Sequence, residues 1–215
     1  MSKAIQAGTF DDLFVGDYLT INGTVYRVAG FNLGKQIGDN TSMGNSMCLV
    51  PDSVLYNAQM HNTDSGQYTE GVAENTTTGA YANSDMRTAN LAHATQKIVS
   101  DFGSSHVMSY RDILPNATAD GQASGWAWYD CKVELMSETM VYGAKVWANS
   151  GYEAGCINSQ FPLFALAPEY IHRRFNYWLR GVWSAACFCR VSDFGYVTDL
   201  SASYSLGVRP FFFVN

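Results

Sequence analysis

The stretch YWLRGVWSAACFCRVSDFGYVTDLSASYSLGVRPFFFVN, residues 177–215, carries the strongest pattern in the sequence. Two apolar phrases, Tyr177–Arg180 and Gly207–Val214, bracket a middle part rich in Tyr, Phe, Ser, Gly and Asp. The apolar phrases predict buried strands, because β-branched and aromatic runs bounded by turn residues are typical of strands. Rigid aromatic side chains among small polar ones are typical of a binding surface, although an ordinary core hairpin can have the same composition.

Four residue types are missing from the middle part. Residues 181–206 contain no Lys, Glu, Gln or Met, whereas the rest of the chain uses all four. Whole-chain usage would place about three of them there. Substitution at the first two bases of an Asn codon can produce Tyr, Ser, Phe, Cys, Asp, Gly, Arg, Val, Thr or Leu, but never these four types, and never Trp. The composition therefore favours diversification of this segment by substitutions in Asn codons. Trp183 lies outside such a scheme or arises from another codon.

The sequence of this segment resembles the C-terminal regions of the variable proteins of diversity-generating retroelements. Those regions are diversified by adenine-directed mutagenesis. The matching frame is Y-W-L-R from Tyr177, S-A-x-x-F-x-x-V from Ser184 and A-S-x-S-x-G-V-R-P-F-F from Ala202. The resemblance covers most of the chain, but it is vague between about residues 40 and 82. Upstream phrases agree with it: Phe10–Leu13, Val15–Asp17, Val133–Glu138 and Gln160–Phe164.

The resemblance implies an α+β, C-type-lectin-like fold with a short N-terminal β-hairpin and a C-terminal antiparallel sheet that carries the variable segment. Residues 1–50 would form a hairpin and strand region packed on the main domain, and residues 51–215 the lectin-like domain, with a variable region at about 177–215. The implied function is binding of a host cell-surface protein or glycan during phage adsorption. The protein would be made in the bacterial cytoplasm and carried on the virion, with cell-surface display as the other option. A non-variable structural protein of a virion, such as a decoration or tail component, is the alternative.

The side chains expected to face the ligand lie between the apolar phrases. The four aromatic ones would be anchors, because rings bury much area at a low entropic cost. Asp193–Gly195 also has the composition of a turn, and Leu200 equally suits the core. Arg180 and Arg209 are expected to bind buried carbonyls or carboxylates, which is a structural role. The full set expected at the ligand is Trp183, Cys187, Cys189, Arg190, Ser192, Asp193, Phe194, Tyr196, Thr198, Asp199, Leu200, Ser201 and Tyr204.

Composition excludes several functional classes. The net charge of −6 with 15% charged residues gives no electrostatic support for nucleic-acid binding. No apolar run is long enough to cross a membrane, so we expect no membrane insertion. The 47% hydrophobic content is enough for a sizeable core. A homo-oligomer would display several weak binding sites together and so raise the overall affinity, which is compatible with a ligand-binding protein. No heptad repeat in the sequence specifies an oligomer.

Catalytic and metal-binding patterns are missing from the sequence. The five cysteines have no zinc-like spacing and are expected to be reduced thiols. The four histidines have no metal-like spacing, and no nucleophile elbow, phosphate loop or His-Glu-x-x-His motif occurs. Glu134 and Glu138 are four residues apart and are expected to have structural roles. We therefore predict no enzyme, no cofactor and no obligatory calcium, although loop oxygen ligands for a structural calcium cannot be read from a sequence.

The layout of the remaining chain is read from turn and cap signals. Asn22-Gly23 predicts a hairpin, because both residues tolerate positive φ. Ser84 is a candidate N-cap and Gly103 a stop signal for a helix whose apolar residues share one face. The expected elements are strands 18–21, 25–29 and 47–50, a long loop 57–82, a helix 85–102, a strand 132–136, a short helix 137–142, a helix 168–175, and strands near Trp178, Phe188, Tyr196 and Val208.

Overall fold

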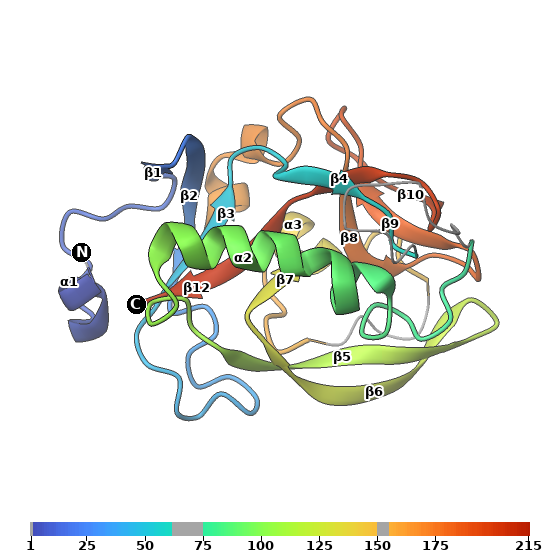
Figure 1. The fold of residues 1–215 in the computed structure, drawn as a ribbon, viewed down its shortest axis with the longest axis horizontal. Helices are drawn as coiled ribbons and strands as arrows, with labels where there is room; N and C mark the ends of the chain where they lie inside the picture. Colours follow the sequence, from blue (N-terminus) through green and yellow to red (C-terminus); the bar gives the residue numbers. More distant parts are fainter. Residues whose placement is uncertain (1, 62–74, 150–154) are drawn as a thin grey trace.

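A computed structural model describes residues 2–61, 75–149 and 155–215 of the chain and shows a mixed α+β fold (Figure 1). Strands predominate, as the sequence predicts. The helices are α1 (Ser2–Ala7), a π-helical turn η1 (Met86–Asn90), α2 (Leu91–Phe102), α3 (Glu138–Tyr142), α4 (Pro162–Leu166) and a 3₁₀ turn η2 (Pro168–Tyr170). The strands are β1 (Tyr18–Ile21), β2 (Thr24–Phe31), β3 (Met47–Pro51), β4 (Tyr56–Ala58), β5 (Tyr110–Ala119), β6 (Gln122–Cys131), β7 (Val133–Leu135), β8 (Tyr177–Val182), β9 (Cys187–Val191), β10 (Val197–Ser201), β11 (Leu206–Val208) and β12 (Pro210–Val214).

The first five-stranded sheet joins the two ends of the chain. Its order is β1-β2-β3-β12-β7, and β12 pairs antiparallel with both β3 and β7. Asn22 and Gly23 have positive φ in the turn between β1 and β2, so the predicted hairpin is confirmed. The predicted boundary between residues 50 and 51 falls inside β3, whose partner is the C-terminal strand. β1, β2 and β3 therefore belong to the same sheet as the C-terminal strand β12.

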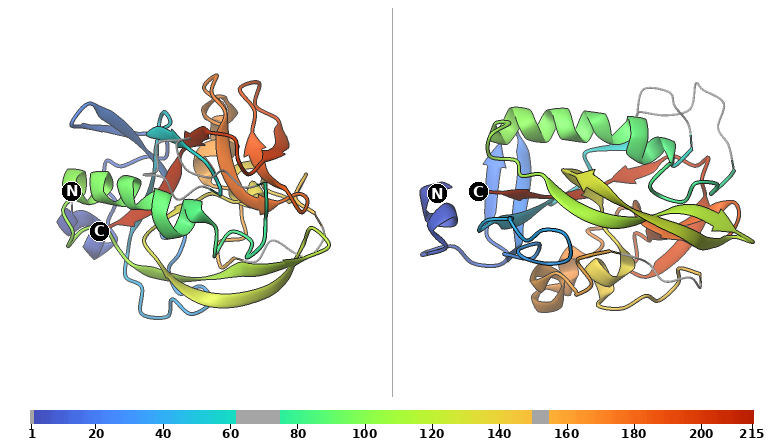
Figure 2. Two further views of the ribbon diagram at one scale, coloured as in Figure 1. Left: turned by 45° about the vertical axis from the view of Figure 1, so that its right-hand side comes forward. Right: turned by 90° about the horizontal axis from the view of Figure 1, so that it is seen from below.

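The second five-stranded sheet contains β8, β9, β10 and β11, which lie within residues 177–215. Its order is β10-β9-β8-β11-β4. In both views of Figure 2, the orange strands β8, β9 and β10 lie on the side of the molecule away from the N-terminus. The chain crosses from this sheet to the first one at Arg209, between β11 and β12. The prediction of a purely antiparallel C-terminal sheet is wrong in one place, because β11 lies parallel to β8. The apolar phrases are buried as predicted, including Trp178, Phe188 and the run Phe211–Phe213.

Helix α2 crosses the first sheet and contacts β7 (Figure 1). The helix prediction for residues 85–102 is confirmed, with a first turn that is π-helical and an end at Gly103, whose φ is 87°. Asp101, in the last turn, accepts hydrogen bonds that fasten the helix to the β1–β2 hairpin. Burial on its own would raise the pKa of the Asp101 carboxyl, but hydrogen bonds from Lys97, Tyr26 and Asn22 outweigh it and hold the pKa below its ordinary value.

A long two-stranded hairpin, β5–β6, runs beside the two sheets and has no counterpart in the sequence-based layout. Its tip reaches the second sheet: a Cβ added at Gly121 would lie 2.7 Å from the backbone nitrogen of Ala185. Gly121 has a φ of 73°, so the turn requires a residue that tolerates the left-handed region and also has no side chain. The hairpin therefore supports the loop between β8 and β9 from outside the sheet.

The short helices show one correct and one wrong prediction. Ser137 caps α3 by accepting a hydrogen bond from the Met140 backbone N–H, and Gly143 ends the helix with a φ of 82°. The predicted helix 168–175 is wrong, because only the 3₁₀ turn η2 forms and the residues after it turn towards β8. The α-helix lies earlier, with Pro162 at its first position. Of the predicted loop 57–82, residues 62–74 lie outside the described residues, and β4 occupies its start.

Two buried arginines connect the sheets to the rest of the fold. Arg180 Nη1 lies 2.9 Å from Asp112 Oδ2, and both side chains are buried. Arg209 donates to the backbone carbonyls of Pro51, Tyr170 and Ile171. The structural role predicted for both arginines is confirmed.

Candidate functional site

The exposed part of the C-terminal segment is the hairpin formed by β9 and β10. The chain reverses through Ser192–Gly195, where Gly195 N–H donates to the Ser192 carbonyl and Ser192 N–H to the Tyr196 carbonyl. Gly195 has a φ of 91°, which confirms the turn predicted there. β10 is an edge strand, so only β9 pairs with it among the described strands. The hairpin therefore presents one turn and one sheet edge to solvent.

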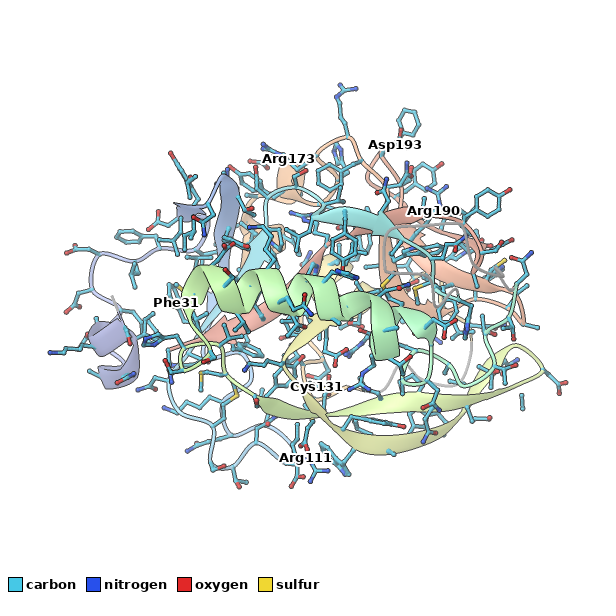
Figure 3. All side chains as sticks on the ribbon, in the orientation of Figure 1. Phe31, Arg111, Cys131, Arg173, Arg190 and Asp193 are labelled. Carbon is cyan, nitrogen blue, oxygen red and sulfur yellow. The ribbon has the colours of Figure 1, made fainter. Side chains whose placement is uncertain are left out.

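The aromatic side chains of this region project from the protein. Phe194 is 77% exposed, and Tyr196 and Tyr204 are each 56% exposed. Large apolar side chains this exposed are unusual for core residues, and rings suit the centre of a binding surface. Figure 3 shows Arg190 and Asp193 at the same end of the molecule. The other predicted residues with accessible side chains are partly exposed: Trp183, Cys187, Arg190, Asp193, Thr198, Asp199, Leu200 and Ser201.

Two of the predicted ligand-facing residues are buried. Cys189 is fully buried, and its sulfur packs beside Gly181, where an added Cβ would lie 3.3 Å from it. Ser192 is buried because its hydroxyl belongs to the turn, where it accepts a hydrogen bond from the Phe194 backbone N–H at 3.2 Å. Both assignments are therefore corrected. Leu200 is partly exposed and packs against the core, as its core alternative predicts.

The loop between β8 and β9 is held through its backbone. Thr77 N–H donates to the Ala185 carbonyl at 3.0 Å, and Thr77 Oγ1 donates to the Ser184 carbonyl at 2.8 Å. Asn149 Nδ2 donates to the Trp183 carbonyl at 2.8 Å. All three acceptors are main-chain atoms, so these contacts fix the path of the loop whichever side chains it carries.

The two ends of β10 are fastened in the same way. At one end, the Tyr142 hydroxyl donates to the Gly195 carbonyl at 3.0 Å. At the other end, the backbone N–H groups of Met60 and His61 donate to the Ala202 carbonyl, and Gln59 Nε2 donates to the Ser203 carbonyl. The donors come from outside residues 177–215, and the acceptors are again backbone atoms of the segment. These particular contacts therefore hold the backbone whichever side chains the segment carries.

A residue that the sequence analysis did not single out lies beside the hairpin. Trp147 is 37% exposed, stacks on Trp183 with ring centroids 4.9 Å apart, and donates from Nε1 to Asp199 Oδ1 at 2.9 Å. It follows α3 in a loop whose next exposed neighbour is Val146, 59% exposed. The signal available in the sequence was the apolar pair Val146-Trp147, which begins three residues after the helix stop at Gly143.

Glu138 positions this loop. Its carboxylate is fully buried and accepts hydrogen bonds from the backbone N–H groups of Val146, Trp147 and Ala148 at 2.6, 2.9 and 2.8 Å. Glu134, four residues earlier, instead forms an ion pair with Arg87 at 3.0 Å. The two glutamates thus serve different structural contacts and do not share a site.

The five cysteines lie in the described part of the chain, together with other potential metal ligands. All five cysteines are free, and burial raises the pKa of the Cys48, Cys131 and Cys156 thiols, which disfavours the nucleophilic thiolate. Within residues 2–61, 75–149 and 155–215, no group of three His, Cys, Asp or Glu side chains is placed to hold a metal ion. None of the helices in these ranges is long and apolar enough to cross a membrane.

Comparison with known proteins gives no assignment for the chain. No protein-family model, curated protein or solved structure matches it. The function of the hairpin is therefore inferred from its geometry and from the sequence motifs of residues 177–215.

Proposed function

We propose that the chain is a ligand-binding protein whose β9–β10 surface is diversified by a retroelement, on a scaffold of the C-type-lectin-like class. The observation that carries the proposal is the way the segment is held. Backbone carbonyls of Trp183, Ser184, Ala185, Gly195, Ala202 and Ser203 accept hydrogen bonds from the rest of the protein, while the side chains of Phe194, Tyr196 and Tyr204 are exposed. Such a surface can change its side chains without losing its backbone position.

The ligand that this surface fits is a host cell-surface protein or glycan, bound during phage adsorption from a place on the virion. Exposed rings at Phe194, Tyr196 and Tyr204 would supply apolar contact area, and Arg190 and Asp193 would supply orientation by hydrogen bonds. The missing Lys, Glu, Gln and Met in residues 181–206 support diversification through Asn codons. The alternative, a non-variable virion protein, does not explain why Lys, Glu, Gln and Met are missing from these residues.

The encoding locus tests the proposal. We expect a reverse transcriptase gene nearby and a template repeat that matches the codons for residues 177–215 except at adenines. The mismatches should fall on exposed positions such as Phe194, Tyr196 and Tyr204, and should be missing from buried ones such as Trp178 and Phe188. A locus without the repeat, or mismatches spread evenly over buried and exposed codons, would refute diversification and favour the non-variable virion protein.

A further inference from the structure

We infer that Trp147 and Trp183 form a constant aromatic anchor inside the otherwise variable surface, and that Glu138 positions this anchor. The inference rests on the proposed function and adds to it two residues from outside residues 177–215. It assigns Trp147 to ligand contact and Glu138 to positioning. An anchor of this kind would receive an apolar group of each ligand, while the changing side chains select among ligands.

The stacking geometry places the two indoles on the surface as one unit. Their planes are inclined by 26° with centroids 4.9 Å apart, so each ring covers one face of the other. Trp147 remains 37% exposed and lies next to the exposed Val146. Asp199 of β10 accepts the Trp147 indole N–H, so the unit is attached directly to the proposed binding strand. Partly exposed tryptophans at the centre of a surface are the residues that most often dominate binding energy.

The genetic code sets both tryptophans apart from the variable positions. Changes at the first two bases of an Asn codon never yield Trp, so Trp183 falls outside the set that diversified Asn codons can produce. Trp147 lies thirty residues before the start of the segment at Tyr177. The stack therefore pairs a residue that this codon scheme cannot produce with one outside its reach. The stack with Trp147 explains why Trp183 lies among residues that Asn-codon substitution can otherwise produce.

The Glu138 carboxylate supplies the rigidity that an anchor needs. A buried carboxylate that accepts three backbone N–H groups from consecutive residues fixes the loop at Val146–Ala148, since hydrogen bonds to charged groups are the strong ones. Asn149 continues this attachment, because its backbone N–H donates to the Val182 carbonyl at 2.8 Å. A ring held in one place loses little conformational freedom on binding, so the entropic cost that reduces the binding free energy is small.

The test uses a library of the full chain on a cell-surface display system. Asn-derived codon mixtures would replace Cys187, Arg190, Asp193, Phe194, Tyr196, Thr198, Leu200, Ser201 and Tyr204, with Trp147, Trp183 and Asp199 kept. Selection against lysozyme as the probe should give several independent binders. Each binder is then compared with its Trp147→Ala, Trp147→Phe, Glu138→Gln and Trp128→Ala variants, for affinity and for melting temperature. Trp128 is the matched control, because it is a similarly exposed tryptophan on β6.

We expect Trp147→Ala to weaken most binders at least tenfold and Trp147→Phe to weaken them less, with melting temperatures close to that of Trp128→Ala. Glu138→Gln should weaken binding too, and the Glu138→Gln/Trp147→Ala double variant should be no weaker than Trp147→Ala alone. Binders that keep their affinity after Trp147→Ala would overturn the anchor. A fall in melting temperature large enough to explain the loss would also overturn it, by assigning Trp147 to stability. A library that yields no binder counts against the proposed function itself, which separates the two failures.

Discussion

The buried ion pair between Arg180 and Asp112 gives the sharpest prediction about stability. Asp112→Ala removes the carboxylate 2.9 Å from the guanidinium and also the acceptor for the Cys156 backbone N–H. Breaking a buried pair from one side typically costs about 3–5 kcal/mol, because the remaining charge stays in a poorly solvated place. Asp112→Ala also leaves a backbone N–H unsatisfied, so its loss of unfolding free energy should be about 5 kcal/mol, the upper end of this range. Arg180→Met leaves Asp112 with its backbone donors and should cost about 3 kcal/mol.

The assay is urea unfolding followed by tryptophan fluorescence, with the free energy of unfolding taken from the midpoint and slope. The double variant Asp112→Leu/Arg180→Met should be more stable than the sum of the single losses by about 2 kcal/mol or more, since it leaves no lone charge. Arg111→Met is the matched control on the neighbouring residue, because Arg111 forms a half-exposed pair with Asp39. Figure 3 shows Arg111 on the side of the molecule opposite Arg173 and Asp193. Its loss should cost less than about 1 kcal/mol. Strictly additive single changes, or Asp112→Ala as mild as the control, would refute this reasoning.

Three further predictions concern the hairpin and the helix end. Phe194→Ser should leave the free energy of unfolding within about 0.5 kcal/mol of the parent, whereas Phe188→Ala should cost about 3–5 kcal/mol; equal costs in urea unfolding would contradict a tolerant surface on a fixed core. Gly195→Ala should lower the melting temperature, because its φ is 91° and an added Cβ would lie 2.6 Å from the His172 ring; an unchanged melting curve would contradict the turn geometry. The pKa of Asp101 is lower in the folded than in the unfolded chain, so its contribution to stability is present above the ordinary value near 3.8 and is lost as the pH falls through the folded pKa. Asp101→Asn should therefore show less loss of stability than the parent between pH 4 and pH 2, and parallel pH profiles would exclude this linkage.

The parts of the fold that could be predicted from the sequence are those specified by local signals. Asn22-Gly23, Ser137 and Gly143 set their turn and caps through backbone preferences of a few neighbouring residues. The β5–β6 hairpin escaped prediction because its strands contain Pro115 and several small residues, and it is specified by pairing over its whole length. The chain also gave no sign that β11 would lie parallel to β8, since a single long-range pairing sets that orientation.

The candidate site divides in a similar way. The surface position expected for Phe194, Tyr196 and Tyr204 is confirmed, and their composition pointed to it because these rings lie among small polar residues. It failed at Cys189, whose burial depends on a close neighbour across the sheet, Gly181. Trp147 could not be placed at all, because its position depends on a buried carboxylate that reaches eight to ten residues along the chain. Contacts of this kind are set by the tertiary fold and leave no periodic pattern.

The crossing of the chain between the two sheets has a consequence for how the protein is made. β3 leaves the ribosome long before β12, its partner, and the second sheet lacks its middle strand until β8 follows. Pairings between distant segments form slowly, and unpaired strand edges are prone to aggregation while they wait. The first sheet therefore cannot be completed before β12 has been synthesised, and β3 lacks one of its two partners until then. β9 and β10 precede β12 in the chain, so their side chains are present while the first sheet is still incomplete.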